Sequence, residues 1–160
     1  MSTQLDSAIT APPIIGDKPN ILIVRAPYYT AIVDGLRNGA VSLLEQAGCM
    51  YEILDVAGAL ELASAVRLAL PGKRNFDGFV VLGCVVRGET DHYEHVCREA
   101  MSGLTWVTLN FGLCLGNGLL TVATEAQAVA RAGADGHNKG GEAAAACLVQ
   151  INAARWLEAV

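Results

Sequence analysis

An unbroken apolar run over 79–86, followed at once by the polar segment 87–91, limits the possible folds of this chain more than any other feature. A run without polar alternation is typical of a strand that is buried on both faces of a parallel sheet. Beyond the polar segment, apolar residues recur at steps of three and four, which predicts a helix over 91–110. A strand over 104–109 is the alternative, but the helical spacing continues through it.

The same succession of strand, turn and helix repeats along the rest of the chain. Apolar segments predict further strands over 21–24, 50–56 and 114–122, and amphipathic or alanine-rich segments predict helices over 31–47, 62–70, 124–133 and 142–157. The glycine-rich segment 136–141 is predicted to be a loop. Strands that alternate with helices pair in parallel and carry the helices on their faces. The sequence thus predicts an α/β fold of three layers, with helices on both faces of a four-stranded parallel sheet.

The polar turn 87–91 has the features of an anion-binding site. It follows a buried strand, at the end where open parallel sheets bind ligands, and it precedes a helix, whose free N–H groups attract anions. Gly88 allows a ligand to approach the backbone closely, and Thr90 or Asp91 can cap the helix. Arg87 either adds positive charge or forms a structural ion pair.

His92 falls in the first turn of the same predicted helix. A helix amino terminus disfavours the imidazolium form, so a neutral imidazole is expected there. Beside a bound anion, a neutral imidazole can move protons during a reaction. The alternative is a histidine that only caps or packs at the start of the helix.

The composition indicates one domain that associates with other subunits. Of the 160 residues, 52% are hydrophobic and 17% are charged, whereas about 25% charged residues are usual. A chain this apolar is expected to bury surface between subunits. The net charge of −5 argues against a nucleic-acid surface. We expect a flexible arm over 1–19, where prolines disfavour helix, and a single domain over 20–160.

The five cysteines are scattered, and no two of them form a C-x-x-C pair. Such spacing is typical of reduced thiols, which predicts a cytoplasmic protein. The first 19 residues lack the basic and apolar regions of a signal peptide, and no apolar run is long enough to cross a membrane.

Four segments, in the right order, resemble one family of known enzymes. The segment 83–93, GCVVRGETDHY, closely resembles the signature of the 6,7-dimethyl-8-ribityllumazine synthases. The segments 58–61 (GALE), 116–121 (GNGLLT) and 131–140, which contains RAG and NKG, resemble three further motifs of that family. The resemblance covers about 21–157 and implies a flavodoxin-like sheet.

The resemblance also implies a reaction and an assembly. Members of the family condense 5-amino-6-(D-ribitylamino)uracil with 3,4-dihydroxy-2-butanone 4-phosphate, which is the penultimate step of riboflavin biosynthesis. They are transferases that need no metal and no organic cofactor. They form homopentamers, sometimes twelve to a capsid, and neighbouring subunits share each active site. The implied partners are therefore small-molecule substrates and further copies of the chain, not nucleic acid or a membrane.

The matched positions imply roles for the residues that handle protons and phosphate. His92 matches the proton-transfer histidine of the family. Thr90 matches a phosphate-binding position, and Glu89 matches another, where its backbone must serve because its carboxylate would repel the anion. Arg131 matches the arginine that binds the phosphate. Lys139 is expected to support that anion or a neighbouring carboxylate.

Other matched positions imply contacts with the uracil. Tyr28 matches an aromatic residue that stacks on the pyrimidine, where the family more often has Phe or Trp. Asn117 takes a position that is often Phe and is expected to reach the heterocycle from the adjacent subunit. The residues expected to contact the ribityl chain and pyrimidine are Ala59, Leu60, Glu61, Cys84, Val85 and Val86.

Three other functions compete with this one. A metal hydrolase would use His92 and His95, which lie three apart on one helix, with His137 as a remote third ligand. A flavin-binding or shell-forming relative without turnover is suggested by Tyr28, Asn117 and Asp135, which depart from common choices in the family. A phosphate-binding module unrelated to riboflavin is the third. The sequence leaves open whether the assembly is a pentamer or a capsid.

Overall fold

The computed structural model describes residues 9–70, 72, 74–133 and 136–158. Its elements follow one another as β1 (Asn20–Ala26), η1 (Pro27–Tyr29), α1 (Thr30–Gln46), β2 (Met50–Asp55), α2 (Glu61–Ala69), β3 (Gly78–Val86), α3 (His92–Phe111), β4 (Leu115–Val122), α4 (Glu125–Ala132) and α5 (Lys139–Glu158). All the strand pairs are parallel, and the strand order across the sheet is β2-β1-β3-β4. The predicted four-stranded parallel sheet is confirmed.

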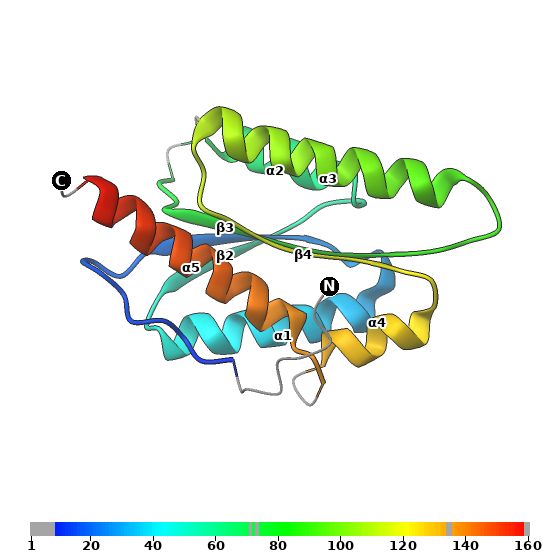
Figure 1. The fold of residues 1–160 in the computed structure, drawn as a ribbon, viewed down its shortest axis with the longest axis horizontal. Helices are drawn as coiled ribbons and strands as arrows, with labels where there is room; N and C mark the ends of the chain where they lie inside the picture. The colour runs from blue at the N-terminus through cyan, green and yellow to red at the C-terminus, as the bar shows by residue number, and fades with distance from the viewer. Residues whose placement is uncertain (1–8, 71, 73, 134–135, 159–160) are drawn as a thin grey trace.

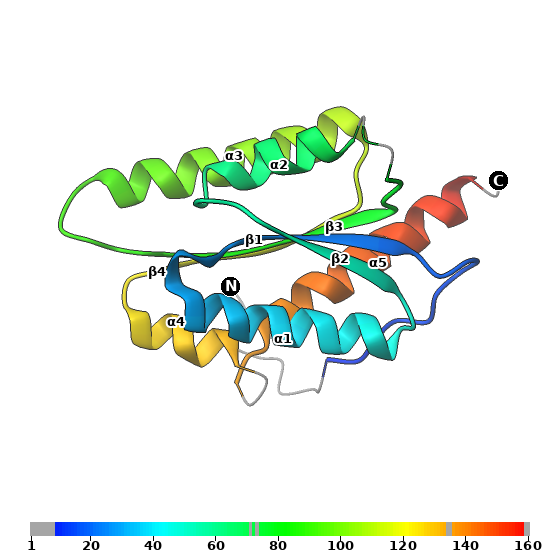
Figure 2. The ribbon, with the colours of Figure 1, turned by 180° about the vertical axis from the view of Figure 1, so that it is seen from behind.

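Helices cover both faces of this sheet, as Figures 1 and 2 show. The helices α2 and α3 lie on one face, and α1, α4 and α5 lie on the other. The strand β3 runs through the middle, and its side chains alternate between the two apolar layers. Val80 and Leu82 pack with α1 and α5, whereas Phe79 and Val81 pack with α2 and α3. Burial on both faces explains why the β3 sequence is apolar without interruption.

The helix predicted over 91–110 is α3, and the alternative strand over 104–109 is wrong. The buried residues of α3 are Val96, Ala100, Leu104 and Val107, which keep helical spacing throughout. The helix ends at Gly112, whose φ of 61° lies in the left-handed region that glycine adopts without strain. The long apolar face of α3 therefore packs on the sheet as a single helix.

The last helix begins earlier than predicted. We expected 136–141 to be a loop, but α5 starts at Lys139 and includes Gly140 and Gly141. The side-chain oxygen of Asn138 accepts a hydrogen bond from the Gly141 amide at 3.0 Å, as a helix cap does. Gly140 is required because α5 passes very close to α1: a Cβ on Gly140 would overlap the carbonyl oxygen of Leu36, whereas a Cβ on Gly141 would meet the capping side chain of Asn138.

Replacing Gly140 with alanine should therefore destabilise the protein. The added methyl group must push α1 and α5 apart, and overpacking of this kind costs about 2 kcal/mol. We expect the Tm to fall by about 5 °C for a chain of this size. Gly133→Ala is the matched control, because a Cβ on Gly133 meets no atom within 4 Å among the described residues. Equal Tm values for the two variants would contradict this account of the α1–α5 contact.

The segment that precedes β1 lies along α5. The Ile15 amide donates to Asn152 Oδ1 at 2.9 Å, and Asn152 Nδ2 donates to the carbonyl of Pro13 at 2.8 Å. Residues 1–8 lie outside the described part of the chain, so the flexible arm over 1–19 and the domain boundary at residue 20 stay predictions. No helix in the described ranges combines the length and the apolar character that a membrane crossing requires.

Candidate functional site

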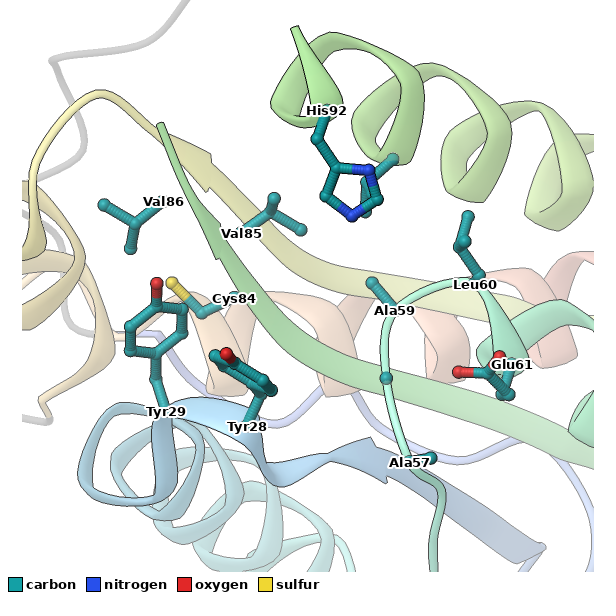
Figure 3. Close-up of a pocket in the computed structure, with 12 residues that line it drawn as sticks. Tyr28, Tyr29, Ala57, Ala59, Leu60, Glu61, Cys84, Val85, Val86 and His92 are labelled. Atoms are coloured by element: carbon teal, nitrogen blue, oxygen red, sulfur yellow. The ribbon is translucent and has the colours of Figure 1, made fainter. Parts of the chain in front are cut away.

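A cavity of about 400 Å³ opens at the carboxyl edge of the sheet. Three strand exits and the start of α3 supply its walls, as expected for ligand sites in open parallel sheets. It brings together eight of the thirteen predicted site residues: Tyr28, Ala59, Leu60, Glu61, Cys84, Val85, Val86 and His92. Figure 3 shows His92 at the start of α3 with its imidazole directed into the cavity, across from the two tyrosines that follow β1.

One wall consists of two aromatic rings on the short helix η1. Pro27 occupies its first turn, where a fixed φ favours the bend that follows β1. The rings of Tyr28 and Tyr29 meet edge to face with centroids 5.2 Å apart. Tyr28 is 77% exposed, which leaves its ring available for stacking. Burial raises the pKa of the Tyr29 hydroxyl, with Tyr28 adding a smaller effect, so this hydroxyl stays protonated at neutral pH.

Tyr29 was not predicted to be a site residue, although it lines the cavity. The resemblance assigned the stacking role to one position only, and the next side chain on an irregular turn cannot be oriented from sequence. Two adjacent aromatic residues at a strand exit were the available signal.

The floor of the cavity is the end of β3, which carries Cys84, Val85 and Val86. The Cys84 side chain is buried, and burial raises the pKa of its thiol to about 11. A thiol with this pKa is protonated at neutral pH and is a poor nucleophile. The floor therefore offers an apolar surface and strand-end backbone groups rather than a reactive sulfur.

The third wall is the turn between β2 and α2. The Glu61 amide donates to the carbonyl of Gly58 at 3.2 Å, which closes the turn just before α2 begins. Glu61 is the first residue of α2 and is exposed. Its carboxylate is the acidic group of the cavity lining, and a carboxylate accepts hydrogen bonds from hydroxyl groups.

The loop 87–91 connects the floor to α3 and is held at its first residue. The Arg87 amide donates to the Val122 carbonyl at 2.9 Å, and its guanidinium pairs with Glu94 at 2.7 Å. The same guanidinium lies 4.6 Å from the centre of the Tyr93 ring. Of the two roles open for Arg87, the structural ion pair is the one observed.

No side-chain cap covers the start of α3 within the described stretch 74–133. Asp91 is the capping residue, but it is helical in conformation and its side chain forms no capping hydrogen bond. The expectation that the side chain of Thr90 or Asp91 caps the helix is therefore wrong. The backbone donors of this first turn are left without a side-chain acceptor of that kind, as an anion site requires.

The other five predicted site residues are not in the described lining of this cavity: Glu89, Thr90, Asn117, Arg131 and Lys139. Glu89 and Thr90 are exposed in the loop next to it. Asn117 and Lys139 line a separate hollow of about 280 Å³ beside β4 and α5, where Lys139 pairs with Glu142 at 2.5 Å. Arg131, on α4, donates to the Gln127 carbonyl at 2.9 Å. Within one chain, Asn117, Arg131 and Lys139 therefore lie outside the described lining of this cavity, whereas Glu89 and Thr90 lie beside it.

The alternative metal site lacks a ligand set. The ring of His95 meets the guanidinium of Arg98, with 2.9 Å between Nδ1 and Nη2. In the part of the chain that the structure describes, no three His, Cys, Asp or Glu residues lie in an arrangement that could hold a metal ion. The His92–His95 pair with His137 therefore gains no support.

Comparison with known proteins identifies the relatives of this chain. The family model described as 6,7-dimethyl-8-ribityllumazine synthase matches residues 18–155. A protein of that name from Bartonella tribocorum is 47% identical over 134 residues, covering 84% of this chain and 89% of its own length. One from Paramagnetospirillum magneticum is 44% identical and covers 86% of this chain and 95% of its own length. One from Azorhizobium caulinodans is 42% identical and covers 97% of both chains.

Proposed function

Because the chain belongs to the 6,7-dimethyl-8-ribityllumazine synthase family, we propose that the cavity at the carboxyl edge of its sheet is where the substrates react. The enzyme condenses 5-amino-6-(D-ribitylamino)uracil with 3,4-dihydroxy-2-butanone 4-phosphate and so takes part in riboflavin biosynthesis. The observation that carries the site assignment is the position of His92 opposite Tyr28 and Tyr29 in one cavity with Glu61.

The uracil occupies the half of the cavity between η1 and β3. Its flat ring stacks on exposed Tyr28, and the polar edge of the ring meets the backbone at the end of β3. The ribityl chain extends toward 57–61, where Glu61 accepts hydrogen bonds from its hydroxyl groups. The apolar floor and the aromatic wall exclude water from the faces of the ring.

The phosphate of the second substrate binds at the uncapped start of α3. Its negative charge is favoured there by the helix dipole and by backbone N–H groups of the loop 87–91. Thr90 adds a hydroxyl donor, Glu89 contributes through its backbone, and Arg131 supplies a bidentate guanidinium. This position puts the ketone carbon of the phosphate substrate between His92 and the uracil.

The reaction then needs proton transfers more than a strong nucleophile. An amine of the uracil attacks the ketone and loses water to form an imine, phosphate leaves, and ring closure expels water again. During these steps His92 donates protons to, and accepts protons from, the carbonyl oxygen and the reacting carbon atoms. Holding both substrates in contact supplies much of the acceleration, because it replaces an encounter in solution.

The complete site forms between neighbouring subunits of a homopentamer or a larger shell. Asn117, Arg131 and Lys139 then reach the cavity from the next subunit, which accounts for their distance from it within one chain. Large apolar side chains support such an interface, because Trp106, Leu109 and Ile53 are all at least 42% exposed. Asp135, which departs from the common choice in the family, lies outside the described residues. Light scattering of the purified protein tests the assembly, and a monomer would contradict it.

We place this enzyme in the cytoplasm. All five cysteines are free thiols, and protein thiols stay reduced in that compartment. Mixing the pure protein with both substrates and following the fluorescence of the lumazine tests the function directly. A non-catalytic relative would bind the product without increasing its rate of formation.

A tyrosine-to-alanine change at position 28 should weaken binding of the uracil substrate. Loss of a stacking ring costs about 1.4 kcal/mol, which is a tenfold rise in the KM for the uracil. Tyr28→Phe is the matched control, because it keeps the ring, and its KM should stay within about threefold of the wild-type value. Steady-state kinetics with each substrate varied in turn measures both. A KM for the uracil that is unchanged in Tyr28→Ala would remove Tyr28 from the site.

A further inference from the structure

We propose that Arg25, which lies outside the cavity, is a positioning residue that sets the separation of the two walls that bind the uracil. It does so through an ion-paired cluster with Asp34 and Asp55. This inference rests on the proposed placement of the uracil between η1 and the turn 57–61.

The cluster has the geometry of a rigid clamp. The Arg25 guanidinium forms two hydrogen bonds with the Asp55 carboxylate, from Nε and from Nη2, each 2.7 Å long. Its third nitrogen, Nη1, donates to Asp34 Oδ1 at 2.8 Å. The Arg25 side chain is only 12% exposed, whereas the two carboxylates are 42% and 49% exposed. A bidentate pair fixes the orientation of both groups, so Asp55 cannot move without Arg25.

The clamp joins three elements at the points where the site loops begin. Arg25 is opposite Asp55 in the register of β1 and β2, and the Arg25 carbonyl accepts a hydrogen bond from the Val56 amide at 2.7 Å. Two residues after Arg25 the chain enters η1, which carries Tyr28. Directly after Asp55 it enters the turn that carries Ala59 and Glu61. Asp34 lies on α1, which directly follows η1.

The positive charge of Arg25 has an effect that the pairing of β1 with β2 does not supply. One guanidinium holds two carboxylates, and if Arg25 were neutral these would repel each other with only the weaker Coulombic effect of Arg37 on Asp55 to oppose it. The hydrogen bond from Arg25 keeps the pKa of Asp55 below its usual range, so Asp55 is ionised at neutral pH. Loss of the arginine charge therefore drives the end of β2 away from α1. Because β2 is at the edge of the sheet, β1 is its sole strand neighbour among the described residues.

The two substrates should respond differently to this change. The walls that the clamp connects contact the uracil, whereas the phosphate site is built from the loop 87–91 and from Arg131. We expect Arg25→Met to raise the KM for the uracil about tenfold, the effect of losing a charge-assisted hydrogen bond. The KM for the butanone phosphate should stay within about twofold. Arg25→Lys keeps the charge without the bidentate fork, so we expect an intermediate rise of about threefold.

A matched control is available earlier in β2, the strand that ends at Asp55. Glu52 on β2 pairs with Arg74, and this exposed pair lies away from the site loops. Glu52→Gln removes one charge from β2, as Asp55→Asn does, and should leave both KM values unchanged. Asp55→Asn should raise the KM for the uracil and weaken binding of the fluorescent lumazine product, which a direct titration measures at equilibrium.

The outcomes separate this proposal from the placement of the uracil itself. A rise confined to the uracil KM and to product binding in Arg25→Met and Asp55→Asn supports the clamp. If the Tm falls while both KM values hold, or if both rise together, Arg25 only stabilises the fold and the proposal is wrong. If Tyr28→Ala leaves the uracil KM unchanged as well, the uracil binds elsewhere, and the proposal falls together with the site assignment. Normal lumazine formation by the wild type would leave the family reaction intact in either case.

Discussion

Replacing His92 with alanine should lower kcat about 100-fold and leave the enzyme measurably active. The loss is large because imine formation and phosphate elimination both need protons moved at neutral pH, and imidazole is the group suited to that task. Activity remains because the cavity still holds the two substrates in contact. Single-turnover measurements with both substrates saturating would report the chemical step without interference from binding.

His95→Ala is the matched control for this experiment. His95 lies one helical turn further along α3, is exposed, and has its ring against Arg98. It should lose no activity, whereas His92→Gln should resemble His92→Ala, because an amide fills the same space without acting as a base. Equal kcat values for wild type and His92→Ala would mean that His92 only packs at the start of α3.

The fold was predictable because most strands and helices have a local signature in the sequence, whether an unbroken apolar run, a three-four spacing or a high alanine content. The unbroken apolar run of β3 marks a strand that is covered on both faces, and the three-four spacing of α3 continues without a gap to Phe111. The start of α5 was not predictable in the same way. Gly140 and Gly141 have the composition of a loop, but Gly140 is required by the close approach of Leu36 on α1, more than a hundred residues away in sequence.

The position of the cavity could be predicted from the topology of the sheet together with the family resemblance. In a parallel sheet all strands end at the same edge, so Tyr28, Glu61 and His92 had to come near one another once their loops were assigned to strand exits. Side-chain direction within those loops was not accessible. The participation of Tyr29, the ion pair of Arg87 and the clamp at Arg25 each depend on a partner that no local pattern specifies.

A single chain does not explain how three of the predicted site residues, Asn117, Arg131 and Lys139, would reach the cavity. They fall within or beside motifs that resemble those of the family, yet within one chain they are absent from the described lining of the cavity. A sequence records which residues a site needs but not which copy of the chain supplies them. Their separation from His92 is therefore the feature that makes a shared site the most informative prediction to test.

Replacing Arg131 with alanine should raise the KM for the butanone phosphate about 100-fold, because a bidentate charged contact with phosphate is lost. The KM for the uracil should change little, since that substrate carries no phosphate. Arg98→Ala, which removes an exposed arginine from α3, is the control and should alter neither value. Competitive inhibition by inorganic phosphate should weaken in Arg131→Ala alone. An unchanged KM for the butanone phosphate would count against Arg131 as a ligand.

Mixed assemblies decide which subunit supplies Arg131. Subunits with His92→Ala and subunits with Arg131→Ala are each defective, and they can be produced together in equal amounts. If a site takes His92 from one chain and Arg131 from its neighbour, about a quarter of the sites regain both residues by random pairing. Activity should then rise well above that of either variant alone. If both residues belong to one chain, every site lacks one of them, and coexpression restores nothing. Recovery would therefore establish the shared site, because changes within a single chain cannot produce it.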